Sequence, residues 1–98
     1  MMAYKLLFSS ESKDDVRAIQ HYLRQFSQKA PERFRRIMRE KLDKVRDNPN
    51  MYEQYRYQPR YRCVQIEKYL LFYYVDDKQK TIYIFRVLHG AQDTPSYL

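Results

Sequence analysis

Glycine, cysteine, histidine and tryptophan are scarce in this chain, with one, one, two and none among 98 residues. Each scarcity excludes a kind of site. P-loops and dinucleotide-binding turns need several glycines where the backbone approaches phosphate groups, whereas Gly90 stands alone and suits a turn with a positive φ. Cys63 has no second cysteine for an internal disulfide or a thiolate zinc site, and is expected to be a small buried apolar residue. The histidines show no ligand spacing, so we expect no metal and no cofactor.

A long hydrophobic run is also missing. The N-terminal sequence MMAYKLLFSSE contains an apolar stretch that is too short for a signal peptide. No segment approaches the roughly 20 apolar residues that a membrane-spanning helix needs. The expected location is therefore the cytoplasm, without a membrane partner.

Aromatic and basic residues are plentiful by contrast. Eleven tyrosines and five phenylalanines contribute much of a hydrophobic fraction of 44%, which is enough for one two-layer core. The length leaves no room for a second core, so we expect a single domain over residues 1–98. Nineteen Lys and Arg against 12 Asp and Glu give a net charge of +7, which suits a nucleic acid, a ribosome or an acidic protein as partner.

The patterning predicts an α+β fold with the order β-α-α-β-β-β. Apolar residues spaced by three and four predict two helices, the first capped by Ser12 and the second with Pro31 at its first position, ending before Asn48. Runs rich in tyrosine and β-branched residues predict the strands, at residues 4–8, 61–67, 69–75 and 81–88. We expect an antiparallel sheet with the first strand at one edge, packed on one face by the N-terminal helical hairpin.

Two clusters of charge are candidate binding surfaces. Residues 29–46 hold eight Lys and Arg against three acidic residues, with Arg33, Arg36 and Arg39 among them. This stretch is either the solvated face of an amphipathic helix or a basic strip for phosphates or an acidic partner. Residues 52–62 interleave tyrosine and arginine, ending in Arg60, Tyr61 and Arg62. They suit base stacking, a protein interface or packing over the sheet edge.

The end of the last strand holds a third set of candidates. Strand alternation places Arg86 on the same apolar face as Ile84, where a cation needs a partner, and Asp93 or Glu67 can supply it. His89 can act as an acid or base near neutral pH, or can be a structural histidine bonded to the backbone.

Two segments together resemble the ParE/RelE superfamily of bacterial type II toxins. RVLHGAQD at 86–93 is similar to the RVLHG-x-x-D ending of the ParE branch, and YRCVQIEKYLLFYYVDD at 61–77 is similar to that branch's two central strands. The resemblance extends from Tyr4 to about Asp93, and it implies the RelE/ParE-like fold.

The resemblance also bears on activity. RelE-like members are ribosome-dependent mRNA endonucleases, and their pattern has an arginine where this chain has Leu70 and a second catalytic lysine where it has Val64. In a nuclease of this kind, the resemblance makes Arg62, Arg86 and His89 the catalytic candidates. The departures favour the ParE branch, whose members poison DNA gyrase and are not known as enzymes. The alternative is the RelE-like endonuclease.

Either branch implies a cognate acidic antitoxin that wraps the toxin, with a toxin–antitoxin hetero-oligomer as the outcome. The target that the resemblance implies is DNA gyrase, or the ribosome and mRNA in the alternative. We expect the helical hairpin's apolar groove and the sheet edge to receive the antitoxin. The residues expected to contact the antitoxin or the target are basic or aromatic: Arg33, Arg36, Arg39, Arg60, Tyr61 and Arg62.

Overall fold

The computed structural model describes residues 4–91 and 94–98. Along these two ranges the chain forms, in order, β1 (Lys5–Phe8), α1 (Ser10–Arg24), α2 (Lys29–Asp47), β2 (Gln54–Tyr55), β3 (Gln58–Ile66), β4 (Tyr69–Asp76), β5 (Thr81–His89) and the short 3-10 helix η1 (Thr94–Tyr97). The predicted α+β order is confirmed, and each predicted strand lies within three residues of its observed bounds.

One mixed sheet has the strand order β1-β5-β4-β3-β2. Strands β3, β4 and β5 form the predicted antiparallel meander. β1 lies at the edge, as predicted, but it pairs in parallel with β5, with Lys5 opposite Thr81 and Phe8 opposite Ile84. The segment expected to be a loop before residue 61 contains β2 and the beginning of β3.

The two helices begin earlier than the sequence suggested. Ser9 caps α1: its hydroxyl accepts a hydrogen bond from the Ser12 backbone N–H at 3.0 Å. Ser12 is buried inside the first turn and donates its hydroxyl to the Ser9 carbonyl. Pro31 is the third residue of α2, where a missing N–H costs little because the first-turn N–H groups have no intrahelical partner.

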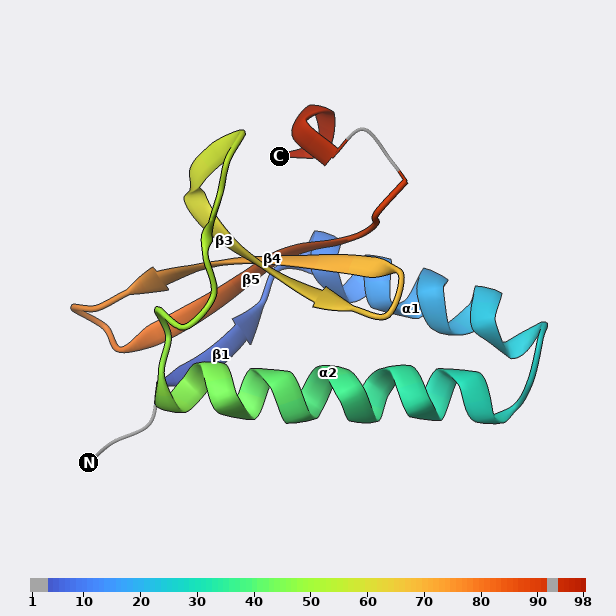
Figure 1. Cartoon of the computed structure of the whole chain (residues 1–98). Coiled ribbons are helices and arrows are strands. Elements are labelled where there is room, and N and C mark those ends of the chain that lie inside the picture. Colours follow the sequence, from blue (N-terminus) through green and yellow to red (C-terminus); the bar gives the residue numbers. More distant parts are fainter. Residues whose placement is uncertain (1–3, 92–93) are drawn as a thin grey trace.

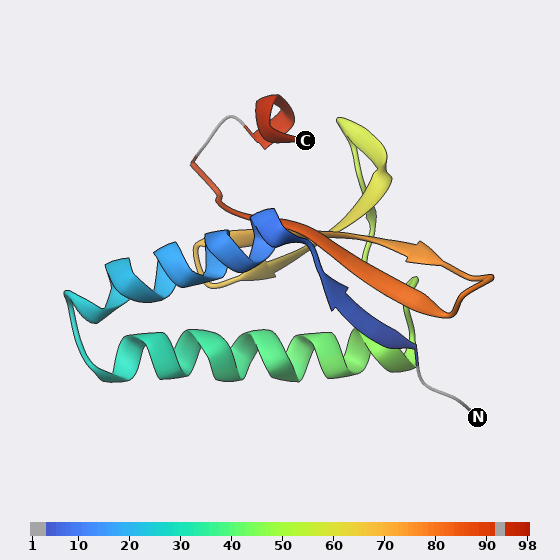
Figure 2. The same cartoon turned by 180° about the vertical axis from the view of Figure 1, so that it is seen from behind.

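Helix α2 and the C-terminal helix η1 lie on opposite sides of the sheet. Figures 1 and 2 show α2 along one face and η1 above the other, with α1 beside the sheet. The α2 stripe of Phe34, Met38, Leu42 and Val45 is buried against this first face, which we call the helix face. Phe26 lies at the helical spacing of three after Leu23, but it follows the end of α1 and is 68% exposed.

The opposite face of the sheet, called the open face below, carries its own smaller apolar cluster. Tyr61, Phe72 and Leu88 are buried there, and Leu98 from the C-terminal end packs against them. Cys63 is half-buried on this face, and burial raises the pKa of its thiol to about 11. Cys63 is therefore less buried than the sequence analysis expected, and its raised pKa disfavours the reactive thiolate.

A bulge in β5 changes which face Arg86 occupies. Phe72 pairs with Arg86 but the next β4 residue, Tyr73, pairs with Ile84, so Phe85 is an extra residue in β5. Directly opposed residues share a face, and the alternation therefore shifts by one at this point. Arg86 lies on the open-face side with Phe72, and the prediction that it shares a face with Ile84 was wrong.

Gly90 is explained by a close approach and not by a positive φ. Positive φ occurs at Glu67 and Lys80, and Gly90 does not adopt it. The Gly90 N–H donates to the Lys68 carbonyl at 2.8 Å, and a Cβ at this position would lie 3.2 Å from that oxygen. The glycine thus lets the chain after β5 pass close to the β3–β4 turn.

Candidate functional site

Arg86 is held by a carboxylate that the sequence analysis did not identify. Asp15 of α1 accepts two hydrogen bonds from the guanidinium, at 2.8 Å from Nε and 2.9 Å from Nη2. The two side chains are 14% and 20% exposed. Of the two partners that were expected, Glu67 pairs with Arg33 instead, at 3.1 Å, and Asp93 lies outside the described residues.

The same carboxylate also accepts a backbone hydrogen bond from the edge of β5. β1 pairs only as far as Ile84, and α1 runs beside the remainder of β5, where Asp15 Oδ2 accepts the Val87 backbone N–H at 2.9 Å. The hydrogen bonds that Arg86 donates to Asp15 raise the pKa of its guanidinium above the ordinary value, against a smaller opposing effect of burial. Arg86 is therefore a permanent cation whose hydrogen-bonding plane faces a protein carboxylate.

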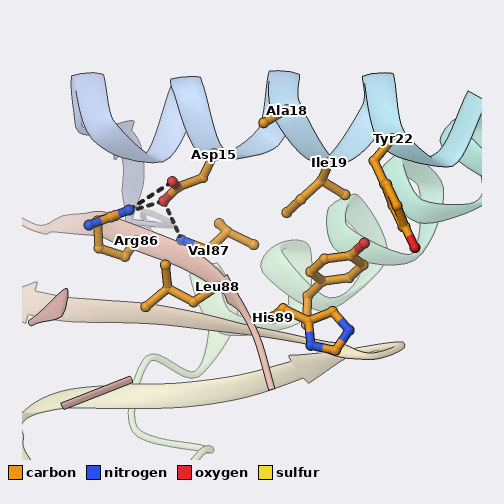
Figure 3. Close-up of a pocket in the computed structure, with 9 residues that line it drawn as sticks. Asp15, Ala18, Ile19, Tyr22, Arg86, Val87, Leu88 and His89 are labelled. Atoms are coloured by element: carbon orange, nitrogen blue, oxygen red, sulfur yellow. Dashed lines mark hydrogen bonds and ion pairs between the residues drawn. The ribbon is translucent and has the colours of Figure 1, made fainter. Parts of the chain in front are cut away.

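A groove separates α1 from the end of β5 (Figure 3). Its first part has a volume of about 390 Å³ and is lined by both elements and by one β4 ring: Asp15, Ala18, Ile19, Tyr22, Tyr69, Arg86, Val87, Leu88 and His89. A second hollow of about 280 Å³ shares Tyr22, Tyr69 and His89 with it and reaches Phe26 and Arg33. We call the two together the α1–β5 groove. Its exposed apolar lining includes Tyr22, which is 51% exposed.

His89 lies in the groove at the opposite end from Asp15 and Arg86, as Figure 3 shows. Its Nδ1 accepts a hydrogen bond from the Ala91 backbone N–H at 3.0 Å. Its ring packs edge-on against Tyr69, with ring centroids 5.4 Å apart. An Nδ1 that accepts a hydrogen bond carries no proton. These contacts orient the imidazole along the end of β5.

The three residues expected to be catalytic in a nuclease do not converge. Arg62 is opposite Tyr73 on the helix face and donates Nη1 to the Tyr52 carbonyl at 2.6 Å. Arg86 belongs to the open-face side. His89 is opposite Tyr69, four β4 residues from Tyr73, which corresponds to about 13 Å along a strand. One phosphate group cannot contact all three side chains in this arrangement.

The residues expected to bind the antitoxin or the target fall on two separate surfaces. On α2, Arg33 is paired with Glu67, Arg36 lies 3.9 Å from Glu40, and Arg39 is exposed.

On β3, Arg60 is exposed and its guanidinium lies over the Tyr74 ring at 4.9 Å. Tyr61 is only 6% exposed and stacks on Phe85, so it supports the open face from beneath. Arg62 extends toward the helix face. The α2 arginines and Arg60 therefore cannot contact one small ligand together.

Asp15 is the functional-site residue that sequence reasoning missed. The sequence showed two acidic residues near a helix start, a pattern typical of the helix dipole alone. A sharper signal was present: Asp15 precedes Ile19 by four residues and therefore lies on the same side of the helix as the apolar stripe. Asp14, by contrast, forms an exposed pair with Arg17.

Within residues 4–91 and 94–98, no three His, Cys, Asp or Glu side chains group in a way that could hold a metal ion. Across the same ranges, neither long helix combines the length and apolar character needed to cross a bilayer.

Comparison with known proteins gives a consistent result. The sequence model of one family, described as the ParE toxin of the type II toxin–antitoxin system parDE, matches residues 6–94. No curated protein sequence matches the chain.

Solved structures match over nearly the whole chain at low sequence identity. A chain of the chromosomal ParDE system from P. aeruginosa matches with a TM-score of 0.71 at 17% identity, covering 89% of this chain and 96% of that one. The intact RelBE complex from E. coli matches at 0.67 and 19%, covering 92% and 100%. A free E. coli RelE with two substitutions matches at 0.69 and 19%, covering 98% and 93%. At these identities the likeness shows the RelE/ParE fold, as predicted.

Proposed function

Because the chain belongs to the family of ParE toxins from type II toxin–antitoxin systems, we propose that it acts as a ParE-like poison of DNA gyrase. As a toxin of the ParE/RelE superfamily it has a cognate antitoxin as the expected partner, since the matched structures are toxin–antitoxin complexes. The proposed location is the cytoplasm, where gyrase and ribosomes are found.

The dispersal of the nuclease candidates is the observation that carries this proposal. In-line attack by a ribose 2′-hydroxyl needs cations at the scissile phosphate and a group that moves protons. Here Arg86 donates its hydrogen bonds to Asp15, and Arg62 donates to a backbone carbonyl on the other side of the sheet. His89 lies in the α1–β5 groove. Leu70, at the position where the nuclease pattern has arginine, packs into the open-face cluster. We therefore assign no catalytic residue.

The alternative is a RelE-like ribosome-dependent mRNA endonuclease. One observation favours it: two cations, Arg60 and Arg86, stand over tyrosine rings on the open face, at 4.9 Å from the Tyr74 centroid and 5.7 Å from that of Tyr97. Such a surface suits RNA. We place it second because Arg86 is paired with Asp15 and the His89 imidazole lies at the opposite end of the α1–β5 groove from Arg86.

For the antitoxin we propose an acidic chain that wraps around the toxin as a hetero-oligomer, with apolar side chains in the α1–β5 groove. Tyr22 and Phe26 offer exposed apolar area there, and Arg33 stands at the rim beside Lys29 and Arg36. A net charge of +7 would accelerate the approach of an acidic partner.

Two reactions of the purified protein test the proposed target. The first contains gyrase, ATP and relaxed plasmid, and it measures supercoiling and trapped DNA cleavage. The second contains programmed ribosomes, and it measures cutting of mRNA in the A site. We expect trapped gyrase cleavage and intact mRNA. Cut mRNA with normal supercoiling would overturn the gyrase proposal and establish the alternative.

His89→Ala adds a control on the chemistry. A gyrase poison transfers no proton, so this variant should poison gyrase as the wild type does, provided that its circular dichroism spectrum is unchanged. A ribonuclease that used the imidazole would lose most of its rate, because a positioned acid or base contributes roughly 10²–10⁴-fold.

A further inference from the structure

We propose that the tip of the β2–β3 hairpin, formed by Arg56 and Tyr57, binds an acidic protein surface on the target of this toxin. The inference rests on the proposed function, in which the target is DNA gyrase, and it names the part of the chain that contacts the gyrase protein. Neither tip residue lines the α1–β5 groove. The tip is also distinct from the two arginines that lie over Tyr74 and Tyr97.

The hairpin stands out from the sheet. Figures 1 and 2 show it in yellow-green, rising on the side of the sheet that faces away from α2. Tyr55 of β2 is opposite Gln58 of β3, so Arg56 and Tyr57 form the two-residue turn between the strands. The register then shifts, which leaves residues 59–61 of β3 without a partner in β2. Extra residues of this kind bend the strand that carries them, and here they direct the tip away from the sheet.

The base of the hairpin is anchored, so the tip is held in place. The Tyr55 ring packs edge-on against the fully buried Phe72, with ring centroids 4.9 Å apart. The Cys63 backbone N–H donates to the Glu53 carbonyl at 3.3 Å and joins the two arms below the tip. A segment that is already ordered loses less conformational freedom when a partner binds, which favours tight binding.

The two tip side chains are exposed and contact their own hairpin. Tyr57 is 60% exposed, its ring centroid lies 5.5 Å from that of Tyr55, and the Arg56 guanidinium lies over its ring at 5.3 Å. Within residues 4–91 and 94–98, Arg56 forms no ion pair. Neither side chain contributes to the core. Exposed tyrosine and arginine side by side are the residue types that dominate the energy of protein interfaces.

The charge of the hairpin indicates the kind of partner. Residues 54–66 contain three arginines and no acidic residue. Arg33, Arg36 and Arg86 elsewhere in the chain each have a carboxylate partner. The planar fork of Arg56 can pair with a carboxylate of another protein through two parallel hydrogen bonds. Opposite charge on that protein would also accelerate its association.

The shape of the tip favours a protein over a nucleic acid as the partner. Single strands are bound by basic grooves in which several rings stack on successive bases. The tip is instead a protrusion with one ring, Tyr57, over which Arg56 already lies. A protrusion of this kind fits a depression on a protein surface.

The position of the tip separates the target from the antitoxin. The α1–β5 groove, the proposed site for apolar side chains of the antitoxin, lies beside β5. The hairpin contains β2, which is the edge strand on the far side of the sheet from β1 and β5. An antitoxin anchored in the groove therefore does not need the tip, which is left for the target.

Surface plasmon resonance with gyrase holoenzyme, in the absence of DNA, tests this contact. The wild type should bind, and Arg56→Gln and Tyr57→Ser should each raise the Kd about tenfold, because a few anchor residues carry most of the energy of an interface. Each variant should also require about tenfold more protein to trap gyrase cleavage on plasmid DNA. Both side chains are exposed, so circular dichroism and urea unfolding should match the wild type.

Arg35→Gln is the matched control, because Arg35 is an exposed arginine on α2, on the opposite side of the sheet from the hairpin. It removes the same charge and should change the Kd less than about twofold. Equal losses for Arg35→Gln and Arg56→Gln would reduce the contact to general electrostatics and overturn the proposal. Unchanged binding by a folded Tyr57→Ser would overturn it as well.

Two further outcomes distinguish the hairpin proposal from the proposed function. If the wild type binds gyrase only when DNA is present, or if the tip variants trap gyrase cleavage as well as the wild type does, the hairpin proposal fails and the gyrase proposal stands. If the wild type neither binds gyrase nor traps cleavage, both fail.

Discussion

Removal of the Asp15 carboxylate should destabilise this protein more than any exposed charge change. In Asp15→Asn the guanidinium of Arg86, 20% exposed, loses its two charge-assisted hydrogen bonds, and the Val87 N–H keeps at most a weaker acceptor. Breaking a buried ion pair on one side costs about 3–5 kcal/mol. Because this pair retains some solvent contact, we expect about 2–4 kcal/mol. For a domain of this size that corresponds to a melting temperature lower by roughly 10–20 °C.

The neighbouring carboxylate provides the control. Asp14 pairs with Arg17 at 3.1 Å, but both side chains are 75% exposed, so Asp14→Asn should cost less than about 0.5 kcal/mol. Urea unfolding followed by circular dichroism gives both free energies. Equal losses in the two variants would refute the reasoning. A paired change, Asp15→Leu with Arg86→Met, should recover much of the loss, because an apolar pair leaves no buried charge.

Three further predictions concern other parts of the molecule. Burial raises the pKa of Cys63 to about 11 and that of Tyr73 to about 12. The stability that comes from burying these two neutral groups is complete below their unfolded pKa values and is lost as pH rises through the folded ones. The unfolding free energy should therefore fall between about pH 9 and 12, and a flat profile there would contradict these shifts. Ser9→Ala removes the α1 cap and a hydrogen bond to β5. It should lower the free energy of unfolding in urea by about 1–2 kcal/mol. A near-zero change would show that the cap is dispensable. Charge reversal at Arg36 and Arg39 should slow antitoxin association in stopped-flow measurements, most at low salt, and an unchanged rate would place the antitoxin elsewhere.

Local patterns were sufficient to predict most of this fold. The helical hairpin and the three-strand meander follow from apolar spacing and short connections, both properties of neighbouring residues. The parallel pairing of β1 with β5 did not follow, because these strands are separated by the whole hairpin and three further strands. The cap at Ser9 was missed for a related reason, since its hydroxyl serves both α1 and the distant Phe85 carbonyl.

The candidate site was harder to predict than the fold. Strand alternation placed Arg86 on the wrong face because the bulge at Phe85 depends on the pairing of β4 with β5, which no pattern within β5 marks. Its partner Asp15 is 71 residues away in the sequence. The resemblance to ParE and RelE toxins identified the family. The separation of Arg62, Arg86 and His89 could be found only from the pairing of the strands in the sheet.

The contacts between the start of α1 and β5 have a consequence for self-association. Beyond the end of β1, three successive edge groups of β5 are already occupied: the Ile84 carbonyl by the Ser9 N–H, the Phe85 carbonyl by the Ser9 hydroxyl and the Val87 N–H by Asp15. An incoming strand from another molecule would need these same groups. Ser9 and Asp15 thus protect a tyrosine-rich sheet against edge-to-edge aggregation along β5. In other proteins the same protection comes from prolines or lysines on the edge strand, or from an element that covers it.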